Sequence, residues 1–91
     1  MPDEAAILQH AEIIIEAVAL SQAMLDRDIV EARFRARLVC TLATDAGLAD
    51  VAGAAQTVVV LLGDGPDLPA AGYGEAIEAL SVAIDEAQAN L

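Results

Sequence analysis

The chain has 91 residues and a net charge of −11, with fifteen acidic residues against four arginines and no lysine. This acidity argues against nucleic acid and anionic membranes as partners, because both require a basic surface. No apolar run approaches the roughly 20 residues of a membrane span, and the acidic start is unlike a secretion signal. A single cysteine, Cys40, excludes an internal disulfide and fits a reducing cytoplasm, where we expect the protein to reside.

The composition favours a helical domain. Hydrophobic residues make up 57% of the chain, so we expect residues 1–91 to fold as a single domain. Alanine is abundant, and Phe34 and Tyr73 are the only aromatic residues. Small side chains suit close helix packing, whereas sheets prefer β-branched and aromatic residues.

The first predicted helix covers about residues 3–25 and has acidic residues in its first turn, where they favour the positive end of the helix dipole. Its residues repeat at alternating intervals of four and three: Ile7, Ala11, Ile14, Val18, Ser21 and Leu25. This spacing is typical of a seam that packs on a partner helix. Four further residues widen the seam into a broad apolar face: Ile13, Ala17, Leu20 and Met24.

The second predicted helix covers about residues 28–46 and ends at Gly47. Asp28 can cap its start, with Glu31 as the partner in a capping box, and glycine favours the left-handed conformation that ends a helix. One arc of the helix carries small residues: Ala32, Ala36, Val39, Ala43 and Ala46. A separate polar stripe consists of Arg33, Arg37, Thr41 and Thr44.

The third and fourth predicted helices cover about residues 48–62 and 72–89, joined by a loop rich in glycine and proline at 63–69. The apolar run 58–62 is also compatible with a buried strand. We favour a helix because the apolar pattern begins earlier and the chain offers no second strand to pair with it. Four helices with short links predict an all-α, antiparallel up-down-up-down four-helix bundle.

The common catalytic and metal-binding motifs do not occur in the sequence. One histidine and one cysteine are too few for a zinc site, and there is no Ser/His/Asp set. The glycines follow no strand and precede no lysine, so they do not form a phosphate-binding loop. We therefore expect no catalytic residues, no metal and no cofactor.

One segment, residues 28–55, carries a recognisable order of residues. In sequence they are Asp28, Ala36-Arg37, Ala43 and Gly47-Leu48. The segment resembles the phosphotransfer segment of histidine-phosphotransfer (HPt) domains. That family has an acidic residue at a helix start, an Ala-His pair with the histidine nine residues later, a further alanine, and Gly-Leu opening the next helix. Counting forward from Asp28 and back from Gly47 both place the histidine position at Arg37, and the family's four-helix bundle matches the predicted helices.

The segment departs from the HPt pattern at four positions. Arg37 replaces the phospho-accepting histidine, Val39 a leucine, Cys40 a lysine and Thr41 a glycine. A histidine attacks phosphate with a neutral ring nitrogen, whereas arginine stays protonated and has no nucleophilic lone pair. The resemblance therefore implies a non-enzymatic, pseudo-phosphotransfer protein of two-component phosphorelay signalling. Its implied partner is a response-regulator receiver domain or a histidine kinase.

The predicted partner surface contains Arg33, Phe34, Arg37, Cys40, Thr41 and Thr44. A guanidinium at the histidine position can pair with the acidic phosphorylation pocket of a receiver domain. The alternative for Arg33 and Arg37 is ion pairing with Glu12 and Glu16 on the first helix. Phe34 and Cys40 have a second interpretation as packing residues.

Two functions from other classes stay open. His10 is the one histidine, and as a phospho-acceptor it would make the protein an active transferase. In an antiparallel hairpin it lies roughly 9 Å along the bundle from the level of Arg37, away from the expected docking centre. The broad apolar face of the first helix also allows a structural homodimer.

Overall fold

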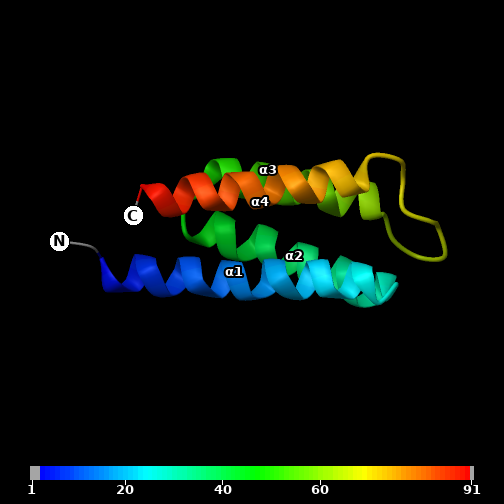
Figure 1. Cartoon of the computed structure of the whole chain (residues 1–91), viewed down its shortest axis with the longest axis horizontal. Coiled ribbons are helices and arrows are strands. Elements are labelled where there is room, and N and C mark those ends of the chain that lie inside the picture. Colours follow the sequence, from blue (N-terminus) through cyan, green and yellow to red (C-terminus); the bar gives the residue numbers. More distant parts are fainter. Residues whose placement is uncertain (1–2, 91) are drawn as a thin grey trace.

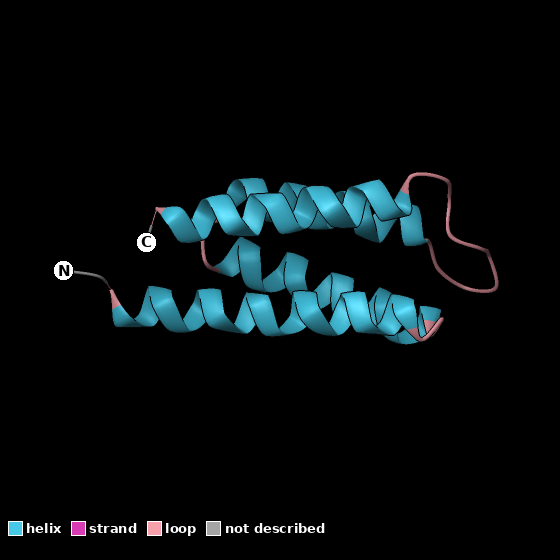
Figure 2. Ribbon diagram, in the orientation of Figure 1, coloured by secondary structure: helices cyan, strands magenta, loops and turns pink. Residues whose placement is uncertain are grey.

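The computed structural model describes residues 3–90, which form four helices and no strand. They are α1 (Glu4–Leu25), α2 (Ile29–Asp45), α3 (Ala49–Leu62) and α4 (Tyr73–Ala89). Successive helices run in opposite directions along a rod with dimensions of 46 × 19 × 18 Å (Figure 1). The predicted up-down-up-down bundle is confirmed, and residues 58–62 lie inside α3, as the helical interpretation predicted (Figure 2). No helix in the described range is both long and apolar enough to cross a membrane.

The first two helices each begin after an acidic capping residue. Asp28 was predicted to cap its helix, whereas Asp3 was predicted to lie within the first turn of its helix. Asp3 Oδ1 accepts a hydrogen bond of 3.0 Å from the amide of Ala5, and Asp28 Oδ1 accepts one of 3.1 Å from the amide of Glu31. The predicted capping box is only half formed, because the Glu31 carboxylate accepts from Arg35 instead. The turn after α2 contains Gly47 at φ 73°, the left-handed conformation in which glycine is unstrained.

The core lies along the arc of small residues on α2. Ala32, Ala36, Val39 and Ala43 are completely buried. The other helices contribute further buried residues to this core: Ile13, Leu20 and Ala23 of α1, Val51, Ala55, Val58 and Leu62 of α3, and Ala76, Leu80 and Ile84 of α4. Alanine-rich contacts allow helices to approach closely, so this narrow bundle needs few large side chains.

The side of α1 that faces the core is not the predicted seam. Ile13 and Leu20 are fully buried, whereas Val18 and Leu25 are 63% and 78% exposed. Both sets of residues recur with helical spacing, but they lie on different sides of the helix. Helix α1 packs extensively on α2 and only lightly on α4, so just one side of its broad apolar surface is covered.

Candidate functional site

Five exposed residues follow one face of α2 and together form what we call the α2 stripe: Val30, Phe34, Arg37, Thr41 and Thr44. Their intervals alternate between four and three, so they lie in one row along the helix. Val30 and Phe34 are 77% and 50% exposed. Arg37 occupies the centre of the row, with an apolar half on one side and two threonines on the other.

Arg37 is the cation of this surface. Its side chain takes part in no ion pair or hydrogen bond among residues 3–90. The Thr44 hydroxyl donates to the carbonyl of Cys40 at 2.8 Å and is therefore satisfied within α2. The guanidinium of Arg37 is thus available to bind a carboxylate from outside the chain, where its planar fork favours a bidentate pair.

Arg35 is the arginine that joins α2 to α1. Its Nη1 lies 2.7 Å from Glu16 Oε2, and its Nε lies 2.6 Å from Glu31 Oε1. Hydrogen bonds to Glu16 and then to Glu31 raise the pKa of Arg35 above its usual value, so it is a fixed cation. The prediction that Arg33 or Arg37 pairs with the first helix is therefore wrong: Arg35 is the residue on the side of α2 that faces α1.

Arg35 also positions the aromatic residue of the stripe. Its guanidinium carbon lies 5.4 Å from the centroid of the Phe34 ring, within the range of a cation–π contact. Half of Phe34 remains exposed, so it is not a core residue, and its ring is still held by the contact with Arg35. A ring held in place in this way presents apolar area to a partner at a low cost in side-chain entropy.

Arg33 is buried, and its placement on an exposed surface was wrong. The residue is 8% exposed, and all three guanidinium nitrogens donate to backbone carbonyls. Nε donates to Leu62 at 3.0 Å, Nη1 to Gly65 at 2.7 Å and Nη2 to Asp67 at 2.5 Å. The carbonyls at the end of a helix have no partners within the helix, so Arg33 caps α3 and holds the loop that follows it.

Cys40 lies beside the α2 stripe, at the boundary between α2 and α3. The residue is half-buried, and its Sγ lies 3.9 Å from the carbonyl of Ala52 and 3.5 Å from Gln56 Oε1. The thiol thus points toward α3 and away from the α2 stripe. The structure brings together four of the predicted surface residues, and Val30 is the member that sequence reasoning missed.

His10 is buried in the bundle. It is 3% exposed, and neither ring nitrogen is accessible or hydrogen-bonded within the described chain. A phospho-acceptor must present a nitrogen to an incoming phosphoryl group, and a proton must be able to leave the ring. This placement opposes the alternative in which His10 makes the protein an active transferase.

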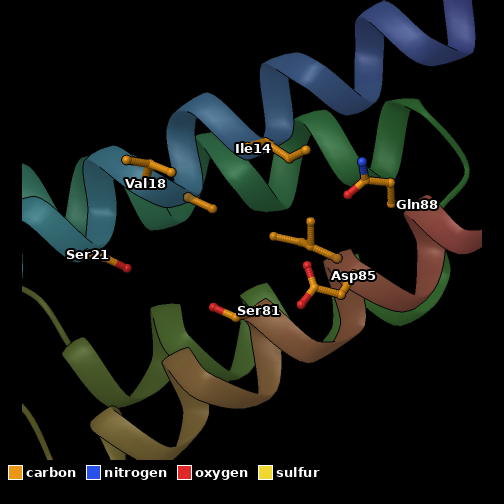
Figure 3. Close-up of a pocket in the computed structure, with 8 residues that line it drawn as sticks. Ile14, Val18, Ser21, Ser81, Asp85 and Gln88 are labelled. Atoms are coloured by element: carbon orange, nitrogen blue, oxygen red, sulfur yellow. The ribbon is translucent and has the colours of Figure 1, made fainter.

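A groove of about 300 Å³ lies between α1 and α4 (Figure 3). Helix α1 contributes Ile14, Ala17, Val18 and Ser21, and α4 contributes Ser81, Ile84, Asp85 and Gln88. The Ser81 hydroxyl donates to the carbonyl of Ile77 at 3.3 Å, and no histidine lines the groove to act as its base. Asp85 lies one turn from Ser81 in the groove, but the structure records no hydrogen bond between them, so the described residues of the groove form no hydrogen-bonded nucleophile–base pair.

No cluster of three or more potential metal ligands occurs within residues 3–90. Comparisons with known family models, with curated proteins and with solved structures found no match to this chain. Its functional interpretation therefore depends on the bundle and on the residues that the bundle exposes. Of these, the α2 stripe combines an exposed cation, apolar area and hydroxyl groups on one helix face.

Proposed function

We propose that the chain is a non-catalytic HPt-like protein that docks a response-regulator receiver domain, or a histidine kinase, through the α2 stripe. One observation carries the proposal. Arg37 is exposed at the centre of the stripe, and it is the residue at the histidine position of the HPt-like segment 28–55. A docking surface requires this position to be accessible, whereas a bundle that merely shared the helix count could have buried it.

The chemistry of the stripe suits an acidic pocket. The receiver phosphorylation pocket implied by the resemblance is a cluster of carboxylates, which a guanidinium can bind in a bidentate pair. Arg37 lacks a nucleophilic lone pair, so it would occupy the pocket without accepting phosphate. Val30 and Phe34 would supply apolar contact on one side, and Thr41 would replace the family's glycine on the other. Such signalling is expected in the cytoplasm.

The first test is a charge reversal at the centre of the stripe. Arg37→Glu is compared with Arg27→Glu, which makes the same charge change in the exposed turn between α1 and α2. Binding to a panel of isolated receiver and histidine-kinase domains is measured by calorimetry. We expect Arg37→Glu to weaken binding about 10-fold to 100-fold, as for a lost charge-assisted contact, and Arg27→Glu to leave it unchanged. A panel without any binder, or equal losses for the two variants, would contradict the proposal.

A second test restores the chemistry. Arg37→His places an imidazole at the position that the resemblance assigns to the phospho-acceptor. A receiver domain that binds the wild type and carries phosphate should then label Arg37→His with acid-labile phosphate. It should label neither the wild type nor Arg27→His. Absence of labelling by every bound receiver would show that position 37 does not meet the phosphorylation pocket.

A further inference from the structure

A row of exposed, uncharged residues runs along the outer face of α1. We call it the α1 stripe, and its members are Leu8, Ala11, Ile15, Val18, Gln22 and Leu25. The four large residues are 61%, 63%, 63% and 78% exposed in chain order. Intervals of three and four residues align them over about 26 Å of helix. Isolated exposed apolar residues are ordinary, but a contiguous row marks an interaction surface.

The bundle itself does not use the α1 stripe. Helix α2 packs on the side of α1 that carries Leu20 and Glu16, and Glu16 pairs with Arg35 there. Helix α4 meets α1 lightly, along the groove in which Val18 forms one edge (Figure 3). The predicted helix-packing face of α1 is therefore wider than this chain alone covers.

We propose that the α1 stripe is covered by α1 of a second copy of this chain, in an antiparallel twofold pair. Each copy carries a net charge of −11, so two copies repel one another over most of their surfaces. They can approach most closely through the six residues of the stripe, which have no carboxylate, while the exposed Glu4 and Glu12 lie at its border. A basic partner would instead be matched by acidic residues within the row.

The residues of the stripe are self-complementary when the second helix runs in the opposite direction. A twofold axis midway between Ile15 and Val18 places each of these opposite the other. The same register places Leu8 opposite Leu25 and Ala11 opposite Gln22. The four large apolar residues therefore meet one another, and Gln22 faces the small Ala11. A twofold interface uses the same patch on both copies, as this pairing does.

The ends of α1 favour the same orientation. Asp3 and Glu4 lie at its start, and Arg27 follows its end, between Asp26 and Asp28. Antiparallel pairing sets the two helix dipoles in opposite directions and brings each Arg27 near the acidic start of the other copy, where Asp26 and Asp28 offset part of its attraction. Parallel pairing would instead place the acidic ends side by side. The inferred interface shares no residue with the α2 stripe, so it goes beyond the proposed function and does not depend on it.

The first test is the mass of the chain in solution. Sedimentation equilibrium should give twice the 9.3 kDa chain mass. Val18→Asp is compared with Val60→Asp, because these valines are 63% and 65% exposed on α1 and α3. Twofold symmetry repeats each change, so we expect Val18→Asp to weaken dimerisation at least about 100-fold and Val60→Asp to leave it unchanged.

Three results of this test would overturn the proposal. They are a wild-type monomer at millimolar concentration, a dimer unaffected by Val18→Asp, and equal weakening by both aspartates. Val18→Ser provides a second variant without a new charge, and it should weaken the dimer in the same direction. The circular dichroism of each variant should match that of the wild type, because the substituted side chains are exposed.

A cross-linking test fixes the orientation. In a Cys40→Ala background, Leu8→Cys and Leu25→Cys are oxidised separately and as a mixture. A disulfide requires Cα atoms within about 7 Å, which the antiparallel register provides between position 8 of one copy and position 25 of the other. We expect covalent dimers in the mixture and not in either variant alone. Cross-linking of each variant with itself would show a parallel pair and refute the proposed register.

Discussion

Replacing Arg33 by methionine removes the side chain that holds the loop of residues 63–72 to α2. The guanidinium donates to three carbonyls, those of Leu62, Gly65 and Asp67. Hydrogen bonds to charged groups contribute about 1.5–3 kcal/mol each after desolvation, so three independent bonds would contribute roughly 4.5–9 kcal/mol. Three bonds from one side chain are not independent, and methionine fills much of the same volume without leaving a buried charge unpaired. We expect a net loss of about 2–4 kcal/mol.

That loss is a large part of the total, because a domain of this size has a free energy of unfolding of roughly 5–14 kcal/mol. Arg33→Lys retains the charge, but one ammonium group cannot span three carbonyls at different positions. We expect lysine to lose about 1–2 kcal/mol. Arg37→Met is the matched control, since Arg37 is exposed and should change stability by less than about 0.5 kcal/mol.

Urea unfolding gives the free energies, and hydrogen exchange identifies the segment that loosens. The amide of Ala70 donates to the carbonyl of Leu61 at 2.7 Å, so it reports on closure of the loop. Arg33→Met should accelerate exchange of this amide more than that of amides within α1. Equal unfolding free energies for Arg33→Met and Arg37→Met, with unchanged exchange at Ala70, would refute the role assigned to Arg33.

Substitutions at three further positions probe the fold. His10→Leu should raise the free energy of unfolding in urea by about 1–2 kcal/mol, because the buried imidazole has no polar partner within the described chain. A decrease would mean that the ring is satisfied. Gly47→Ala should lower the same free energy by about 1–2 kcal/mol, because φ is 73° there. Gly53→Ala, in the interior of α3 with open space around it, should raise it by about 1 kcal/mol. Changes of the same sign at the two glycines would contradict the distinction between a left-handed turn at Gly47 and an ordinary helical position at Gly53.

The boundaries of α1 and α2 can be predicted from sequence because residues next to each helix end determine them. Asp3 and Asp28 cap the helices that they precede, and Gly47 supplies the left-handed turn after α2. The small arc of α2 is also a local pattern, since alanines at helical spacing leave room for close neighbours. These features depend on residues a few positions apart, so the sequence alone is sufficient to place them.

The predictions that were wrong concern contacts between distant parts of the chain. Periodicity shows that α1 has a broad apolar surface, but the choice between Val18 and Leu20 as core residues depends on where α2 lies. Arg33 and Arg37 are one helical turn apart, so sequence places them on one side. The end of α3 buries Arg33 alone, and its acceptors are backbone carbonyls, which carry no residue-type signal. Only the resemblance assigns Arg37 to the proposed docking position.

Each helix packs mainly on the helix that precedes or follows it along the chain, and α1 and α4 add little to one another. Contacts between sequence neighbours close short loops, so each forms at a small entropic cost. Chains whose contacts are local fold fastest, and helical bundles of this kind fold in microseconds to milliseconds. The turns that join α1 to α2 and α2 to α3 are short, whereas residues 63–72 separate α3 from α4. Docking of α4 on α3 would then be the late event of assembly, because it closes the longest loop between the described helices.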